Sequence, residues 1–202
     1  MNRRIESGGK SRICDALCQL GKDRPIERVT VQEIIALAGM NRSTFYYHFD
    51  GVSAVLEWMI SEFLKEYLQL LFDIPKGDND VLLDSDILFE QEENICTLIQ
   101  RRKNYLELFF SQYNERHFRE RFWDEYKKYA SVYDLAVIHS RKDIRTIKRG
   151  IVYDYCLRVN FAIWFELLSY WHDRKFHETS RDFLEVFDVL FGGVIGFENN
   201  RS

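Results

Sequence analysis

The chain has 202 residues, of which 46% are apolar and 30% charged, and it carries a net charge of −4 at pH 7. This apolar content is sufficient for a sizeable buried core, and the low numbers of glycine (10) and proline (2) favour long helices over an all-β chain with dense turns. The sequence contains neither a run of 18 apolar residues nor an apolar signal segment at its N-terminus. We therefore expect a cytoplasmic protein with no membrane contact and with reduced cysteines.

A first helix is predicted from about Gly9 to Leu20, and Gly21 is expected to end it. Its inward face has apolar residues at helical spacing: Ile13, Ala16, Leu17 and Leu20. Ile26 and Val29 are expected to pack the following connection onto the same core.

Two of the four cysteines, Cys14 and Cys18, lie one helical turn apart in this helix, whereas Cys96 and Cys156 lie much further along the chain. A pair at this spacing without nearby histidines is not a recognised zinc site, so no metal is expected. The pair has two interpretations, which are plain packing of the helix or a response to oxidants. The residue types favour packing.

The segment TVQEIIALAGMNRSTFYYHF, from Thr30 to Phe49, carries the strongest local signals in the chain. Thr30 and Glu33 have the spacing of a capping box, in which the two residues satisfy amide donors at a helix start, so a helix is predicted to begin at Val31. Its inward face is formed by Val31, Ile34, Ile35 and Ala38. Gly39 follows, where the left-handed conformation that ends a helix costs glycine nothing.

Asn41 is expected to cap a second, short helix after this turn. Phe45 and Phe49 are four residues apart on one side, where they would anchor that helix, and polar residues fall on its other sides. Arginine bonds guanine edges, serine and threonine reach phosphates or bases, and tyrosine offers a hydroxyl and a ring, so these side chains suit DNA. The residues predicted to contact DNA are Thr30, Asn41, Arg42, Ser43, Thr44, Tyr46, Tyr47 and His48. A helical hairpin without a DNA partner is the alternative interpretation.

This segment resembles the tetracycline-repressor (TetR) family of bacterial transcription regulators, whose N-terminal domains carry the pattern T-V-x-x-I-x-x-x-A-G-x-x-x-x-T-F-Y-x-H-F. Every defined position of the pattern is filled between Thr30 and Phe49. The resemblance implies an all-α fold of about nine helices. It has a three-helix helix-turn-helix DNA-binding domain at residues 1–50, a linking helix at 51–72, and a larger helical effector-binding and dimerisation domain at 73–202. In that family the linking helix carries effector-driven motion to the DNA-binding unit.

The chain departs from the family at Val52, because members usually carry a lysine three residues after the final Phe of the pattern, where it contacts the DNA backbone. We therefore expect weaker nonspecific DNA affinity and a shallower salt dependence than in a lysine-bearing relative. Four basic residues near the N-terminus either compensate as a DNA-contacting arm or form an ordinary solvated tail. These residues are Arg3, Arg4, Lys10 and Arg12.

A long helix capped by Asp50 is predicted next. Its apolar residues at helical spacing are Val55, Leu56, Met59, Ile60, Phe63, Leu64, Tyr67 and Leu71. The segment Ile74–Asp80 has the residues of a loop, and the second domain begins there. Five further helices are predicted at about Ser85–Arg102, Tyr105–Tyr113, Glu115–Val137, Ile147–His172 and Thr179–Phe197, with a polar connection around His139–Arg145. Thr179 and Asp182 are expected to cap the last helix.

The last two predicted helices have broad apolar faces, with Tyr155 and Val159 among them, that either join two copies of the chain or belong to its internal core. The resemblance favours the first interpretation, because these helices form a dimer in that family. The residues predicted at the interface are Ala162, Phe165, Glu166, Tyr170, Phe183, Val186, Phe187, Leu190, Phe191 and Val194. A symmetric dimer would place two reading helices about one DNA turn apart on a near-palindromic site.

The second domain is rich in aromatic residues, which either line a pocket for a small effector or fill a helical core. The predicted pocket residues are Phe109, Phe110, Tyr113, Phe122, Trp123, Tyr126, Tyr153, Arg158 and Trp164. Such a lining would suit an apolar or aromatic effector, and His117 or Asn160 would add polar groups.

Charge is unevenly divided along the chain, since residues 1–50 carry eight Lys or Arg against six Asp or Glu, and the remainder has a net charge of −6. The basic excess therefore lies with the motif, where DNA would bind.

The sequence shows no catalytic constellation, cofactor motif or phosphate-binding glycine loop, so we expect neither an enzyme nor a cofactor. The favoured function is a homodimeric repressor released from its operator by a small effector. The alternatives are the same fold controlled by a protein partner, as a co-activator or DNA-organising protein, and remotely an enzyme with an accessory DNA-binding domain.

Overall fold

The computed structural model describes residues 3–72, 85–140, 151–179, 182 and 185–186. All regular elements in these residues are helical, so the fold is all-α, as predicted. The elements are α1 (Arg3–Gly21), the short 3₁₀ helix η1 (Ile26–Arg28), α2 (Val31–Ala38), α3 (Arg42–His48), α4 (Val52–Phe72), α5 (Ser85–Arg101), α6 (Lys103–Phe109), α7 (Glu115–Ser140) and α8 (Ile151–Asp173).

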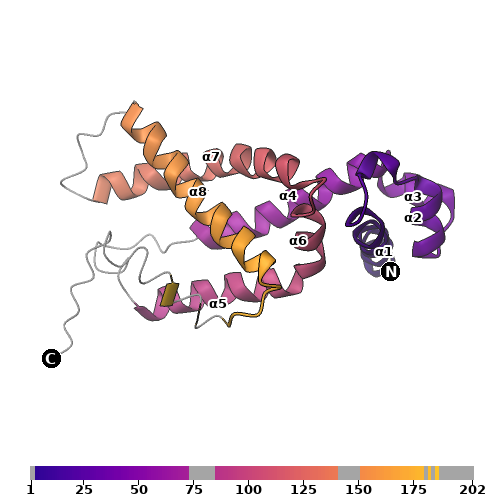
Figure 1. Ribbon diagram of the computed structural model, residues 1–202, viewed down its shortest axis with the longest axis horizontal. Coiled ribbons are helices and arrows are strands. Elements are labelled where there is room, and N and C mark those ends of the chain that lie inside the picture. Colours follow the sequence, from indigo (N-terminus) through magenta and orange to yellow (C-terminus); the bar gives the residue numbers. More distant parts are fainter. Residues whose placement is uncertain (1–2, 73–84, 141–150, 180–181, 183–184, 187–202) are drawn as a thin grey trace.

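The first three helices gather at one end of the molecule, and α4 runs from there along the second half of the chain (Figure 1). α1 contacts α2, α3 and α4, and α2 contacts α3. Their shared core contains fully buried side chains from each helix, namely Ile13, Leu17, Ile34 and Phe45. Ile26 and Val29 are also buried, so the connection packs onto this core as predicted.

Helix α4 is the central element that the other helices cover. Its predicted inward side chains, from Val55 to Leu71, are all buried, and Leu68 joins them. It contacts α1 and η1 near one end of the molecule and α5 and α7 beyond them. The predicted cap was wrong by one residue, because the carbonyl of Gly51 rather than Asp50 accepts the first helical hydrogen bond, from the amide of Val55 at 3.3 Å.

Several helix bounds differ from the prediction. α1 begins at Arg3 rather than Gly9, and Gly9 within it lies close to His48 of α3 although glycine has a low helix propensity. α6 covers Lys103–Phe109 rather than Tyr105–Tyr113, because the chain turns at Phe110 and Asn114 Nδ2 donates back to the Leu108 carbonyl at 3.1 Å.

α7 continues to Ser140, so the predicted polar connection starts later than His139. The rest of that connection lies outside the described residues, as does the predicted loop Ile74–Asp80. Most of the predicted last helix, Thr179–Phe197, also lies outside them, but its start is described. There Thr179 Oγ1 accepts from the Asp182 amide at 3.3 Å and Asp182 Oδ2 accepts from the Thr179 amide at 2.8 Å, which confirms the predicted cap.

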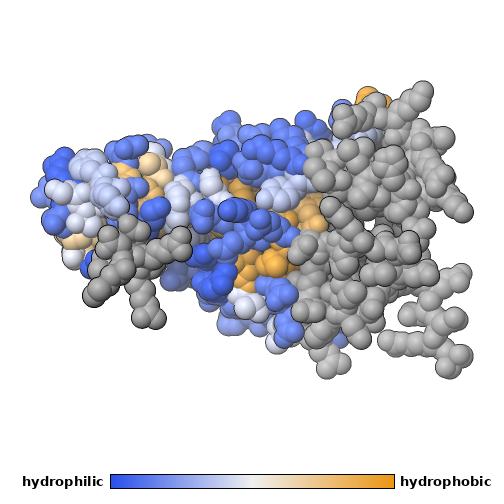
Figure 2. Space-filling model, turned by 180° about the vertical axis from the view of Figure 1, so that it is seen from behind, coloured by the Kyte–Doolittle hydropathy of each residue, from blue (hydrophilic) through white to orange (hydrophobic). Residues whose placement is uncertain are grey.

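Hydrophilic residues cover most of the described surface, and smaller apolar areas lie between them along the middle of the molecule (Figure 2). The second half has an aromatic core in which rings from α4, α6, α7 and α8 meet, including Phe63, Phe109, Phe118, Phe122 and Phe165. Among the described residues, no helix is both long and apolar enough to cross a membrane.

Candidate nucleic-acid interface

The start of α2 is fixed by the predicted capping box. Thr30 Oγ1 accepts from the Glu33 amide at 3.3 Å, and Glu33 Oε2 accepts from the Thr30 amide at 2.9 Å. Arg24 adds an ion pair to Glu33 Oε1 at 2.8 Å. The Arg24 guanidinium, followed by the Thr30 hydrogen bonds, lowers the pKa of Glu33 to about 2. The carboxylate therefore holds α2 to the segment before η1.

The turn between α2 and α3 has the geometry that the sequence predicted. Gly39 is left-handed, with φ 61° and ψ 47°, and the Met40 amide donates to the Ile35 carbonyl at 3.0 Å. Asn41 Oδ1 then accepts from the Thr44 amide at 2.8 Å and from the Thr44 hydroxyl at 2.9 Å. These bonds start α3 at Arg42 and set its direction relative to α2.

The inward side of α3 is anchored by aromatic packing. Phe45 is fully buried and Phe49 nearly so, as predicted. His48 lies against α1, because a Cβ placed on Gly9 would come within 2.6 Å of His48 Nε2. A side chain at position 9 would therefore displace the His48 ring from its place against α1.

The outward side of α3 carries the polar and aromatic groups. Tyr46 and Tyr47 are 44% and 71% exposed, and Arg42 and Ser43 are exposed beside them. The Arg42 guanidinium lies 5.5 Å from the Tyr46 ring centre, and its Nη2 donates to the Tyr46 hydroxyl at 3.4 Å. Arg42 is thus held in an outward-facing pair that displays guanidinium donors and a phenol together.

The eight residues predicted to contact DNA therefore fall into two groups. Arg42, Ser43, Tyr46 and Tyr47 form one exposed face. The side-chain oxygens of Thr30, Asn41 and Thr44 take part in the cap hydrogen bonds described above, and His48 packs against Gly9. These four build the reading helix and position its exposed face.

One of the four basic residues near the N-terminus lies beside the C-terminal end of α3. The Lys10 ammonium is 5.0 Å from the Trp58 ring and 5.8 Å from the Phe49 ring. Val52, where the family pattern has lysine, is half-buried and packs against the core. Arg12 is exposed and its Nε donates to the Gly8 carbonyl at 3.4 Å. Arg3 and Arg4 lie in α1, but their side chains are outside the described residues.

Two joints connect this unit to the second half. In the first, Tyr105 of α6 is hydrogen-bonded to the buried thiol of Cys14 of α1, and Leu108 lies where a Cβ on Gly21 would clash at 2.8 Å. Burial raises the pKa of Cys14 to about 11 and raises that of Cys18 as well. Raised thiol pKa values oppose reaction with oxidants, so the packing interpretation of this cysteine pair is favoured.

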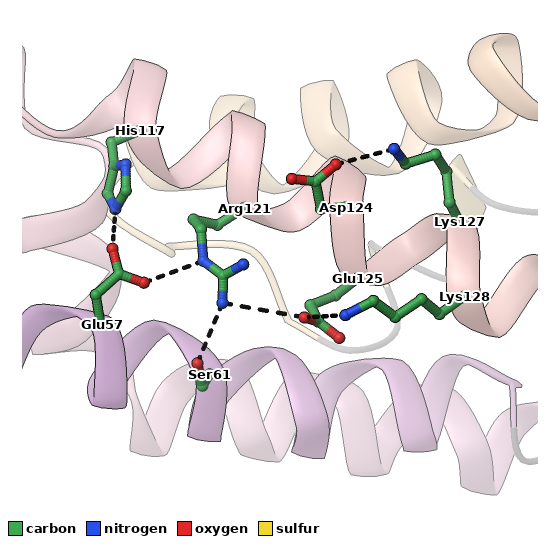
Figure 3. Close-up of polar contacts among 8 residues, drawn as sticks. All are labelled: Glu57, Ser61, His117, Arg121, Asp124, Glu125, Lys127 and Lys128. Atoms are coloured by element: carbon green, nitrogen blue, oxygen red, sulfur yellow. Dashed lines mark hydrogen bonds and ion pairs between the residues drawn. The ribbon is translucent and has the colours of Figure 1, made fainter.

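The second joint is a polar network between α4 and α7 (Figure 3). Glu57 accepts from Arg121 Nε at 3.1 Å through Oε2, and its Oε1 lies 2.5 Å from His117 Nε2. Arg121 Nη2 also donates to Ser61 at 3.4 Å. From the sequence, His117 was suggested as a polar group of a ligand pocket. The network itself was not predicted, because the residues it joins are 60 or more positions apart in the chain.

The residues predicted at a dimer interface are only partly on the surface. Phe165 is fully buried among rings of the same chain, so assigning it to the interface was wrong. Glu166 and Tyr170 are exposed, and Ala162 is half-buried. Val186 is 44% exposed. The other predicted members lie outside the described side chains: Phe183, Phe187, Leu190, Phe191 and Val194.

The predicted pocket residues are packed against one another. Phe109, Phe110, Phe122 and Tyr126 are buried with ring neighbours, for example Phe122 and Tyr126 at 6.4 Å. Trp123 lies between the Arg158 and Lys127 cations, at 5.0 and 5.3 Å. The remaining three differ in exposure: Tyr113 is 41% exposed, and Tyr153 and Trp164 are half-buried.

Helices α1–α3 share a buried core, and α3 exposes an arginine, a serine and two tyrosines on its outer side. This arrangement is that of a helix-turn-helix DNA-binding protein. Residues 13–57 match the model of the family described as bacterial regulatory proteins, tetR family. The whole chain is similar in fold to the fatty acid degradation regulator FadR from Bacillus halodurans, with a TM-score of 0.61 and 12% identity over 96% of this chain and 97% of that one. No curated protein matches the sequence.

Residues 13–57 are therefore similar to the DNA-binding domain of tetR-family transcriptional regulators, and the structural match shows that the chain shares its fold with FadR. The family is one of regulators rather than enzymes, in agreement with the prediction from the sequence.

Proposed function

We propose that the protein is a homodimeric repressor of the cytoplasm that binds a near-palindromic operator and is released from it by a small effector. The observation that carries this proposal is the exposed face of α3, where Arg42 is held against Tyr46 beside Ser43 and Tyr47. In the domain division that we propose, residues 1–50 read DNA, 51–72 link, and 73–202 bind the effector and dimerise.

The α3 face suits base reading in the major groove. A guanidinium donates two parallel hydrogen bonds to the O6 and N7 atoms of guanine, and an exposed phenol adds a hydroxyl and an apolar ring for a neighbouring base or phosphate. Lys10 is the basic side chain that we propose for the backbone contact that Val52 lacks, because its ammonium lies beside the C-terminal end of α3.

Dimerisation through α8 is supported by a row of exposed apolar side chains. Ile151, Tyr155 and Val159 follow at intervals of four residues and are 72%, 66% and 57% exposed. Side chains at this spacing share one face of a helix, and such a contiguous apolar face is typical of an interface. A second copy packed there would pair two reading helices, and this pairing is the reason to expect an operator with two related halves.

Release by an effector is supported by the two joints. α1 is tied to α6 through Cys14 and Tyr105, and α4 is tied to α7 through Glu57 and Arg121. A ligand that favours one arrangement of the second domain would therefore shift the reading heads through these contacts. We propose a small apolar or aromatic effector.

One observation favours the second candidate, in which the same fold works as a co-activator or DNA-organising protein under the control of a protein partner. The rings expected around an effector instead fill the core: Phe109 and Phe118 are stacked at 4.9 Å and both are fully buried. A core packed to this density leaves no space for a ligand between those two rings.

Selection of binding sites from random duplexes tests the proposed function. We expect the bound fraction to yield two related half-sites, and Arg42→Ala or Tyr46→Ala to weaken binding of the selected duplex by about 1–3 kcal/mol. Arg116→Ala is the matched control, because Arg116 is an exposed arginine that belongs to α7 rather than to α3. Selection of no sequence would contradict the repressor, and unchanged affinity of the α3 variants would contradict the assigned face.

A further inference from the structure

A hollow of about 600 Å³ opens beside the C-terminal half of α4. Its volume falls within the range of small-ligand sites, which is roughly 300–1,000 Å³. Three helices contribute to it: α4 provides Glu66, Gln69, Leu70 and Phe72, α5 provides Arg101, and α7 provides Tyr129. None of these six residues is among the nine pocket residues predicted from the sequence.

The polar part of the lining, Glu66 and Arg101, adjoins a second arginine, Arg102. Arg101 Nη2 lies 2.5 Å from Glu66 Oε2, and Arg102 Nη2 lies 2.7 Å from Glu66 Oε1, so a single carboxylate faces two guanidinium groups. The Arg101 side chain is 62% exposed. Arg102 Nε is buried and has no hydrogen-bond partner among the described residues. The exposed Arg101 guanidinium is therefore accessible to the carboxylate of a ligand.

The rest of the lining is largely apolar. The Phe72 and Tyr129 rings are stacked with their centres 6.1 Å apart, and Leu70 lies on the same stretch of α4. All three side chains are half-buried, so part of each faces the hollow or solvent. A ligand that reaches from Arg101 to these residues must combine an anionic head with an apolar tail.

We infer that this hollow binds an amphipathic carboxylate, with its head on Arg101 and its tail along Leu70, Phe72 and Tyr129. The inference rests on the proposed function, because the hollow would be the binding site of the proposed effector and an amphipathic carboxylate would be its chemical class. The ligand carboxylate takes the place of Glu66 on Arg101 and thereby breaks an ion pair between α4 and α5. Since α4 continues to the reading head, this exchange connects the site to DNA binding.

Calorimetric titration of the full chain with sodium decanoate, below its micelle concentration, tests the site. Saturable binding is expected, and Arg101→Gln weakens it about tenfold or more, as for the loss of a charge-assisted hydrogen bond. Glu66→Gln tightens it several-fold, because the competing carboxylate is gone. Arg116→Gln, on an exposed arginine elsewhere, leaves it unchanged. Decylamine and decanol, which lack the anionic head, bind much more weakly.

The opposite signs of the Arg101 and Glu66 variants make the test specific, because a merely structural ion pair would weaken binding in both variants. Absence of saturable decanoate binding, equal binding of decylamine, or weaker binding to Glu66→Gln overturns the site. Operator binding is measured separately on the same preparations. If the protein binds its operator but not decanoate, only the proposed ligand site is contradicted. If it binds decanoate but no operator, the proposed repressor function is contradicted and the ligand site stands.

Discussion

The hydroxyl of Tyr105 on α6 donates a hydrogen bond to the buried thiol of Cys14 on α1, so a contact between the two halves of the chain passes through a cysteine. Both groups are kept protonated by burial, which raises the pKa of each. The contact is therefore insensitive to pH across the physiological range.

Alkylation measures how tightly this contact is closed. With a pKa of about 11, Cys14 is deprotonated in only about one molecule in a thousand at pH 8, and iodoacetamide reacts with the thiolate. We expect labelling of Cys14 and Cys18 in the native protein to be slower than in urea by a factor of about a hundred or more, read by mass spectrometry at each site. Equal rates in buffer and urea would show that α1 and α6 separate freely.

The glycines at positions 39 and 8 form a matched pair for testing the turn. Gly39 has a positive φ of 61°, so Gly39→Ala should lower the free energy of unfolding by about 1–2 kcal/mol. Gly8 lies in α1 with open space at its Cβ position and no positive φ, so Gly8→Ala should be neutral or stabilise by up to about 1 kcal/mol. Urea denaturation measures both variants. Equal effects would contradict the conformational explanation.

Acid should weaken the reading head through Glu33, whose pKa of about 2 lies below its ordinary value of 4.5. A carboxylate with a lowered folded-state pKa stabilises the fold above about pH 4.5, and this stabilisation is lost as the pH falls towards 2. Glu33→Gln should therefore be less stable than the wild type at pH 7, and the difference should shrink between pH 4.5 and pH 2. Glu120→Gln, in an exposed pair on α7, is the control. A difference that does not change with pH would refute the ionic role of Glu33.

Charge placed on the apolar face of α8 should separate the proposed dimer. Tyr155→Lys combined with Val159→Lys puts two ammonium groups on the face that a second copy would bury, where unpaired charge is costly. Sedimentation velocity should show a dimer for the wild type and a monomer for this variant. Leu37→Lys is the matched control, since Leu37 is 48% exposed on α2. A variant that remains dimeric would exclude this face.

The Glu57–Arg121 ion pair should contribute more to the free energy of unfolding than a more exposed ion pair does. Its side chains are 43% and 29% exposed, against 61% and 92% for Glu120 and Arg116. Double-mutant cycles with Gln at each position are expected to give a coupling near about 1 kcal/mol for the first pair and near zero for the second. Equal couplings would show that the α4–α7 network adds nothing to the joint.

The reading head could be predicted from the sequence because its determinants are local. The capping box at Thr30, the left-handed Gly39 and the Asn41 cap each act within four residues, and the structure has all three. Burial of Phe45 beside exposed Tyr46 also follows from helical spacing alone.

The second half was predicted less well because its contacts join distant segments. Periodicity identified an apolar face on α8 but could not tell which rings turn inward, and Phe165 lies in the core whereas Tyr155 and Val159 are exposed. The ion pairs of Glu57 and Glu66 likewise depend on how α4, α5 and α7 pack. Helical spacing carries no information about partners on other helices.

The close approach of Gly21 to Leu108 restricts how this regulator can be recombined with its relatives. A chimera cut at residue 50 would place a foreign α6 against the C-terminal end of α1, where a side chain at position 21 would force the tips of Ile26 and of the residue at position 108 to move. DNA specificity should therefore be exchanged by grafting α3 alone, from Arg42 to Tyr47, or by moving α6 together with the first three helices.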